Sequence, residues 1–331
     1  MKLRLIIIAA LGAGLAVYLI GHVGFNAVLS AALTIGWGGF AIFCAYALAL
    51  FVLLGTAWHI LVARASFAQL KTLIWSRMVR DSAAELLPFS QVGGFVIGAR
   101  AAILGGLTPS AAFASTVVDV TAEMMAQVAY VALGIALLAG RAPQTSFTAS
   151  LTGALIVGLI VTGVAGGIFL FLQRRGMWIT EKLALRWLPQ TLSHATAFAA
   201  ALEAIHRTPL RVAASMVVHF AGWIASAMAT WLALRLIGIH AGVGTVIALE
   251  ALICALRSAA FAVPSALGVQ EAAYAVLAPL LGLGPEIGLA VSLLKRARDI
   301  AIGVPALLTW QAIEGRHALA PRAKDANYLK S

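Results

Sequence analysis

Ten ionisable residues lie within long apolar stretches of the sequence, away from its polar loops. Five are acidic and five are basic, which predicts that they pair with one another. A charged side chain facing lipid at the centre of a bilayer would cost roughly 2.5–3.5 kcal/mol. If these stretches cross a membrane, we therefore expect the ten side chains to face the protein interior or a watery cavity. They are Arg100, Asp119, Glu123, Glu250, Arg257, Glu271, Lys295, Arg296, Arg298 and Asp299.

Such a set could line a polar path for a charged group. A guanidinium binds phosphate well because its donors match the phosphate oxygens, which makes arginines 257, 296 and 298 candidates for a headgroup site. The carboxylates of Asp119, Glu123 and Glu271 could hold a cationic headgroup or relay a proton. Lys295 could instead reach toward the membrane surface. The alternative interpretation is that all these residues form structural ion pairs that hold a helical bundle together.

Other chemistry has little support in the sequence. His59 and His219 stand alone on apolar helices, where a histidine usually hydrogen-bonds between helices. The sequence contains no phosphate-binding loop motif, no zinc-ligand spacing and no nucleophile elbow. We therefore predict no catalytic residue, no metal and no cofactor, and do not expect an enzyme.

The composition places these residues in a membrane protein. Of 331 residues, 62% are hydrophobic and 11% are charged, and no soluble domain could keep so much apolar surface from water. The net charge of +11 does not indicate a nucleic-acid partner, because most cations fall in loops on one predicted side. That bias predicts cytoplasmic amino and carboxyl termini and contacts with anionic lipid headgroups at the cytoplasmic interface.

Apolar periodicity predicts an all-α polytopic protein with one transmembrane domain over residues 1–313 and a cytoplasmic tail over 314–331. Two segments, 66–105 and 244–281, are each broken by a proline, at Pro88 and Pro264, and read as helical hairpins that could be re-entrant. The total is six spans plus two hairpins, or eight spans. Residues 177–206 resemble an amphipathic interfacial helix, and a soluble loop helix is the alternative. The predicted spans are 5–21, 33–63, 109–139, a stretch ending at Leu172, 209–236 and 285–313.

The two hairpin regions resemble each other at a shift of 176 positions, from 264 to 88. This shift aligns the two prolines, aligns G-L-G-P at 282–285 with G-L-T-P at 106–109, and places Lys295 on Asp119. Glu271 aligns with Phe95 and has no acidic counterpart. Because the loop charges put the hairpins on opposite sides, units 66–139 and 244–313 are predicted to be inverted repeats, typical of transporters. Chance similarity of apolar sequence is the alternative.

The run V-P-S-A-L-G-V-Q-E, residues 263–271, resembles the P-G-G-x-G-x-x-E signature of the lysylphosphatidylglycerol synthase transmembrane, or flippase-like, family. The first copy, with Gly93 and Gly94, and D-V-T-A-E at 119–123 look most like the stand-alone members associated with hopanoid biosynthesis. The resemblance assigns Pro264, Gly268 and Glu271 to the family's hairpin. Ser265 and Ala266 replace its glycines, which predicts a looser bend or another headgroup.

The resemblance implies a lipid translocase of a bacterial inner membrane that moves a polar or anionic-headgroup lipid, such as a hopanoid or a phospholipid. No soluble aminoacyl-transferase domain follows Ile313 in this sequence, so synthase activity is not implied. Membrane lipids are the expected partners, and a homo-oligomer is compatible with the sequence. A scaffold for lipid-modifying enzymes and an intramembrane lipid transferase are the alternative functions.

Overall fold

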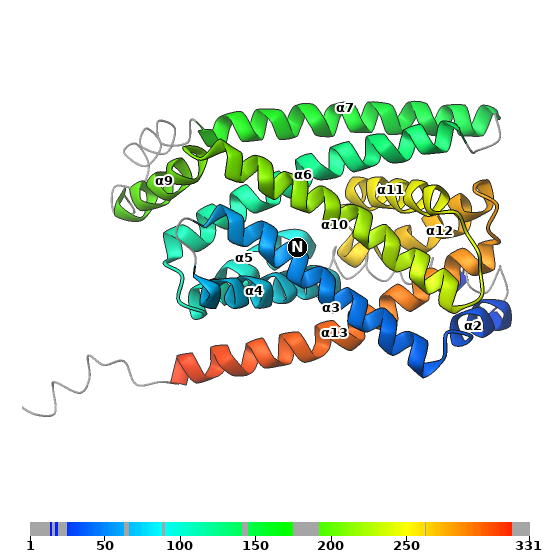
Figure 1. Ribbon diagram of the computed structural model, residues 1–331, viewed down its shortest axis with the longest axis horizontal. Helices are drawn as coiled ribbons and strands as arrows, with labels where there is room; N and C mark the ends of the chain where they lie inside the picture. Colours follow the sequence, from blue (N-terminus) through cyan, green and yellow to red (C-terminus); the bar gives the residue numbers. More distant parts are fainter. Residues whose placement is uncertain are drawn as a thin grey trace, which may run out of the picture.

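The protein is a bundle of helices in the computed structural model (Figure 1). The structure describes residues 14, 17–18, 25–62, 66–87, 90–140, 145–174, 192–261 and 263–319. Most of the predicted span 5–21, Pro88 and the end of the tail from residue 320 lie outside this part of the chain. The helices are α2 (Phe25–Leu33), α3 (Gly36–Leu61), α4 (Phe67–Leu86), α5 (Ser90–Leu104), α6 (Pro109–Ala139), α7 (Ser146–Arg174), α9 (Leu192–His206), α10 (Pro209–Leu236), α11 (Val243–Ala259), α12 (Val269–Leu280) and α13 (Pro285–Leu319), with a 3₁₀ turn η2 (Pro264–Ala266) before α12.

Four of these helices, α3, α6, α7 and α10, are long and apolar enough to cross a membrane. They correspond to four of the predicted spans. α13 is also long, with 35 residues, but it is not among these four helices, and it carries four charged residues between positions 295 and 299. It continues past the predicted end at Ile313, so the part of the predicted tail up to Leu319 is helical.

Two helical hairpins lie between the long helices. The α4–α5 hairpin enters the bundle from one end and the α11–α12 hairpin from the other (Figure 1). The second arms, α5 and α12, contain 15 and 12 residues. At 1.5 Å per residue these arms are about 22 and 18 Å long, whereas the hydrocarbon core of a bilayer is about 30 Å thick. The lengths favour arms that end inside the membrane, and the opposed directions are those expected of inverted units.

The tip of the second hairpin has a strained backbone. Ser265 and Ala266 have φ angles of 54° and 46°, and Gly268 has a φ of 76°. Side chains other than glycine are disfavoured in this left-handed region. The two residues that replace the family's glycines therefore adopt a conformation that favours glycine, and a bend looser than in other family members stays a prediction. The Glu271 carboxylate closes the turn by accepting a hydrogen bond of 2.8 Å from the Gly268 amide.

Close packing of the first hairpin depends on small residues. A Cβ atom on Gly98 would lie 2.7 Å from the Cβ of Arg80, and one on Gly94 would lie 2.7 Å from the Arg80 carbonyl oxygen. α5 can therefore approach α4 this closely only because these residues lack side chains. Gly93, the neighbouring residue of the predicted motif, is half-buried.

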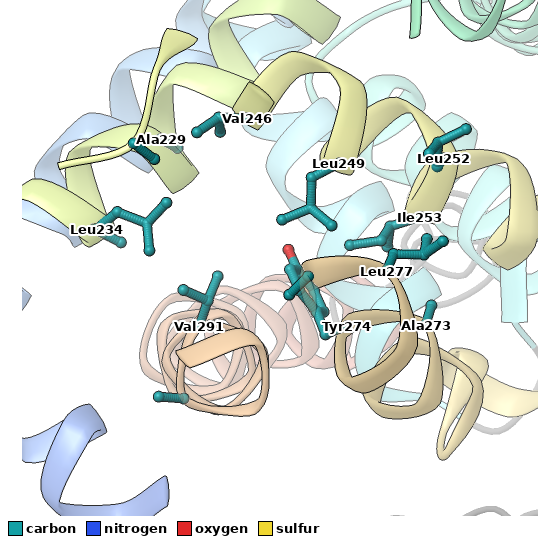
Figure 2. Packing of buried hydrophobic residues seen from close by; sticks show 14 of the residues in the cluster. Ala229, Leu234, Val246, Leu249, Leu252, Ile253, Ala273, Tyr274, Leu277 and Val291 are labelled. Atoms are coloured by element: carbon teal, nitrogen blue, oxygen red, sulfur yellow. The ribbon is translucent and has the colours of Figure 1, made fainter. Parts of the chain in front are cut away.

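The largest apolar core surrounds the second hairpin (Figure 2). Leu249 of α11, Tyr274 of α12 and Val291 of α13 are almost fully buried there. A smaller cluster packs Leu202 and Ile205 of α9 against α6 and α10. α9 is the described part of the predicted interfacial helix 177–206, and one face of it rests on protein.

We expect Ala266→Gly to stabilise the protein by about 0.5–1 kcal/mol, because glycine removes the left-handed strain at a smaller cost in chain entropy. The measurement is reversible unfolding in mixed micelles. Ala259→Gly, in the last turn of α11, is the matched control and should be destabilising. If both changes destabilise equally, the strain at Ala266 is not significant.

Candidate functional site

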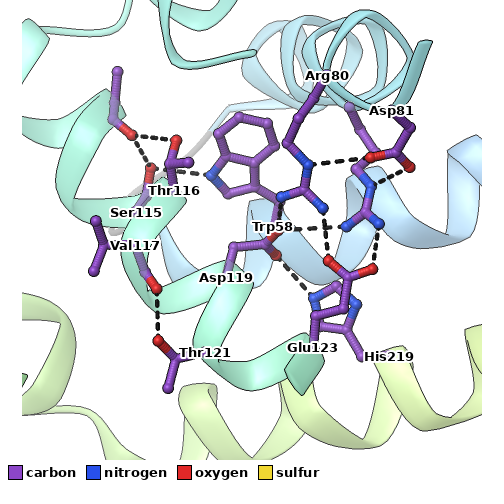
Figure 3. Close-up of polar contacts among 12 residues, drawn as sticks. Trp58, Arg80, Asp81, Ser115, Thr116, Val117, Asp119, Thr121, Glu123 and His219 are labelled. Atoms are coloured by element: carbon purple, nitrogen blue, oxygen red, sulfur yellow. Dashed lines mark hydrogen bonds and ion pairs between the residues drawn. The ribbon is translucent and has the colours of Figure 1, made fainter. Parts of the chain in front are cut away.

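The first charge cluster joins three helices (Figure 3). Arg77 and Arg80 of α4 together contact Asp119 and Glu123 of α6. Arg80 Nη1 lies 2.7 Å from Asp119 Oδ2, and Arg80 Nη2 lies 2.6 Å from Glu123 Oε2. Arg77 also bonds to Glu123 and lies 3.5 Å from Asp119. Both arginines and Asp119 are buried, so each charge is neutralised by a partner on another helix.

The remaining sides of this cluster are also occupied. His219 of α10 places Nε2 2.9 Å from Asp119 Oδ1, the interhelical role predicted for this histidine. Asp81 accepts from the Nε atoms of Arg77 and Arg80, at 2.8 and 3.1 Å. With these bonds in place, Asp119 and Glu123 have partners inside the protein, and a cationic headgroup would have to displace them.

Aromatic rings enclose the Arg80 guanidinium. Its Cζ lies 5.7 Å from the centre of the Trp58 ring and 5.6 Å from that of Phe95. Cation–π attraction at these distances adds to the ion pairs. Trp58 in turn donates from Nε1 to the Ser115 hydroxyl at 3.0 Å, which ties α3 to α6 beside the cluster.

Arg77 and Arg80 were missed as site residues. The positive-inside bias counts them with the cytoplasmic loop cations, whereas the structure buries both side chains in the bundle. A signal was present in the sequence, since residues 77, 80 and 81 share one helical face. Asp119 and Glu123 present two carboxylates at the same spacing of one helical turn.

The second charge cluster is a closed network around Glu250 of α11. Lys295 Nζ lies 2.6 Å from Glu250 Oε2 and 3.0 Å from the Tyr274 hydroxyl. Tyr274 and Thr230 donate to the other carboxylate oxygen, the latter at 2.7 Å. The side chains of Lys295 and Glu250 are only 9% and 6% exposed. Lys295 therefore points into the core, and reaching toward the membrane surface is excluded.

The third group, which we call the junction, lies where the tips of the two hairpins meet. Glu85, at the end of α4, bonds through Oε1 to Arg257 Nη2 of α11, and its Oε2 lies 3.7 Å from Arg296 Nη1 of α13. Arg296 Nε also donates to Glu271 Oε1 at 3.1 Å. The junction therefore contains two arginines and two glutamates from four helices. Glu85 was not predicted as a site residue, because its partners lie in distant segments of the chain, on α11 and α13.

The remaining predicted site residues lie elsewhere. Arg298 pairs with its neighbour Asp299 at 2.6 Å and lies over the ring of Phe43, with 5.2 Å between its Cζ and the ring centre. Arg100 is 44% exposed and pairs with Glu314 at 2.8 Å, so it belongs neither to the two clusters nor to the junction. The hydrogen bonds from Arg100 lower the pKa of Glu314 below its ordinary value.

Comparison with known proteins gives one assignment. The family model described as the lysylphosphatidylglycerol synthase TM region matches residues 3–306. The chain belongs to this family. No curated protein and no solved structure matches it. Within this family assignment, the hairpin residues Pro264, Gly268 and Glu271 lie beside the junction, because Glu271 both closes the turn and binds Arg296.

Lys295 and Asp119, which align at the shift of 176, carry opposite charges, and each pairs with the first helix of its own hairpin. In the first unit the hairpin helix α4 supplies cations, and Asp119 of α6 supplies the anion. In the second unit the hairpin helix α11 supplies Glu250, and Lys295, which aligns with Asp119, supplies the cation. Phe95 and Glu271 are also aligned at this shift. Phe95 contacts Arg80 by cation–π attraction, and Glu271 forms an ion pair with Arg296. The partners themselves do not align, because Glu250 falls on Ile74 at this shift and Arg80 on Leu256. The shared origin of the units stays a prediction.

We expect Asp119→Asn to destabilise the protein by about 3–5 kcal/mol, because it leaves two buried arginines short of an anion. Glu314→Gln removes a carboxylate from an exposed arginine pair and should cost at most about 1 kcal/mol. Unfolding in mixed micelles measures both changes. Equal losses of stability would contradict the assignment of Asp119 to a structural cluster.

A double-mutant cycle tests the second cluster. Lys295→Met alone should destabilise by about 3 kcal/mol or more, since it leaves Glu250 buried without its cation. Adding Glu250→Gln should recover part of that loss, because no uncompensated charge remains. If the two changes are additive in unfolding measurements, the pair does not act as a unit.

Proposed function

We propose that this chain is a lipid translocase, which moves a lipid with a polar or anionic headgroup between the leaflets of a membrane. The supporting observation is the junction, where charged side chains remain partly exposed between the hairpins. Glu85 and Arg257 are 23% and 25% exposed, in contrast to the closed second cluster. A headgroup could contact these side chains while its acyl chains stay in lipid.

The depth of the junction supports this proposal. Arg296 is eleven residues beyond Pro285, and this stretch of α13 is about 17 Å long. Half the thickness of a hydrocarbon core is roughly 15 Å, so a helix that begins at the membrane surface near Pro285 would carry Arg296 to about the middle of the bilayer. Charged residues that are reachable at that depth are costly, and they typically mark a substrate path.

Two hairpins that enter from opposite ends would also suit alternating access. In transporters built from inverted units, the site lies near the midplane and one unit moves against the other. The junction occupies the corresponding place, since Glu85 comes from one hairpin and Arg257 from the other. The structure and the family assignment support a transporter more directly than a scaffold or a transferase.

The ends of the bundle agree with the predicted sidedness. The end of α3, the start of α4, the α9–α10 connection and the end of α13 lie at one end of the molecule. The end of α6, the start of α7 and the α10–α11 connection lie at the other (Figure 1). We propose that the first end is cytoplasmic and that the membrane is a bacterial inner membrane. A hopanoid or a phospholipid is the proposed cargo.

Reconstitution in liposomes that carry fluorescent lipids tests the proposal. The protein should accelerate leaflet exchange over empty vesicles, and Glu271→Gln should slow it at least about tenfold, because a neutral amide weakens the hold on Arg296. Gln can still accept the hydrogen bond from the Gly268 amide, so the turn should survive. Arg100→Gln, outside the junction, is the control and should exchange lipid like the parent.

Exchange no faster than in empty vesicles, for hopanoid, zwitterionic and anionic lipids alike, would contradict translocation. Normal exchange by Glu271→Gln would remove that residue from the path but not the activity.

A further inference from the structure

The bonds of Arg296 leave one side of its guanidinium open. Nε donates to Glu271 and Nη1 faces Glu85, but Nη2 is buried and has no hydrogen-bond partner among the described residues. The Oε2 atom of Glu85, which faces Nη1, also lacks a hydrogen bond. A buried guanidinium donor is costly to leave unpaired. The arrangement therefore suits an acceptor with more oxygens than a carboxylate has.

Charge balance limits how such an acceptor can bind. Arg257 and Arg296 are balanced by Glu85 and Glu271, so the junction is neutral as it stands. Glu271 is held by the Gly268 amide and the Ser292 hydroxyl as well as by Arg296. Glu85 makes contacts with the two arginines alone among the described polar groups, and it is the more exposed of the two glutamates. An incoming anion would therefore displace Glu85 more readily than Glu271.

We propose that Arg257 and Arg296 form a binding site for a phosphate group, and that Glu85 occupies this site as an internal competitor until a phosphate replaces it. A phosphate diester presents two charged oxygens and two ester oxygens in a tetrahedral arrangement, so it can bind both guanidiniums and also reach Arg296 Nη2. The exchange leaves the number of anions on the arginines unchanged, because the Glu85 carboxylate leaves as the phosphate arrives.

The exchange would also loosen the contact between the hairpins. Among the described residues, the ion pairs that connect α4–α6 with α11–α13 are the two made by Glu85 and the exposed pair of Arg100 with Glu314. Phosphate binding would break the two at the junction. Phosphate binding would thereby be coupled to movement of one hairpin relative to the other. Such coupling requires that the phosphate bind more tightly when the Glu85 contacts are broken than when they are made.

This inference rests on the proposed function for its biological meaning, but a binding measurement tests it independently of transport. The probes are a short-chain phosphatidylglycerol, a diacylglycerol with the same acyl chains but no phosphate, and inorganic phosphate. Native mass spectrometry of the full chain in detergent measures retention of the two lipids, and inorganic phosphate is added as a competitor.

Glu85→Gln should bind the phospholipid about tenfold more tightly than the parent, since the competitor loses its charge. Arg257→Gln and Arg296→Gln should bind it about tenfold more weakly. Diacylglycerol binding should not change in any variant. Arg100→Gln and Glu314→Gln, which break an arginine–glutamate pair outside the junction, should match the parent.

If inorganic phosphate competes with the phospholipid, the phosphate group itself is the ligand. If it does not compete, and the variants still bind the phospholipid in the expected order, the ligand is a phosphate carried by a lipid. If Glu85→Gln folds poorly, the test uses the two arginine variants and Glu85→Asp. Glu85→Asp should bind the phospholipid more tightly than the parent, because its shorter carboxylate reaches the arginines less well. Unchanged or weaker phospholipid binding by the Glu85 variants would overturn the inference, as would arginine variants that bind normally. If the protein exchanges lipid but the variants do not bind phospholipid in the expected order, translocation is supported and the phosphate site is not. If the variants bind in that order but no lipid is exchanged, the phosphate site is supported and translocation is not.

Discussion

The structure depends on one constraint, which is that a charge inside an apolar bundle must have an opposite charge from another helix within reach. The contacts of Arg80 with Asp119 and Glu123 meet this constraint between α4 and α6. Lys295 and Glu250 meet it between α13 and α11. Losing one partner would leave a charge that the apolar surroundings cannot solvate. The ion pairs thereby set which helices must be neighbours.

The three groups of charges differ in how completely the protein satisfies them. In the second cluster Glu250 has a lysine, a tyrosine and a threonine as partners, so little capacity remains for a ligand. In the first cluster the charged groups are paired and aromatic rings enclose Arg80, while His219 Nδ1 has no hydrogen bond among the described residues. At the junction, by contrast, a guanidinium nitrogen and a carboxylate oxygen are left without hydrogen bonds. Binding chemistry is therefore expected at the junction, while the two clusters provide rigid supports on either side of it.

The family assignment and the geometry meet at the second hairpin. Its signature residues form a strained turn in which Ser265 and Ala266 adopt left-handed backbone angles. Strain of this kind persists where surrounding contacts hold it, and it is common at functional sites. Here the turn directs Glu271 toward Arg296, so the backbone of the hairpin and the charge at the junction are parts of one arrangement.

The sequence by itself determined the class of fold, four of the apolar spans, both hairpins and the family, because hydrophobic length and prolines are local properties of the chain. It also identified most of the buried charges, since an ionisable residue in an apolar stretch is conspicuous. The pairing of those charges was decided by the tertiary structure. Arg77, Arg80 and Glu85 looked like surface residues because α4 is polar, yet they bind Asp119, Glu123 and Arg257 from distant segments. Partners across helices depend on which faces pack together, and no local pattern in the chain records that choice.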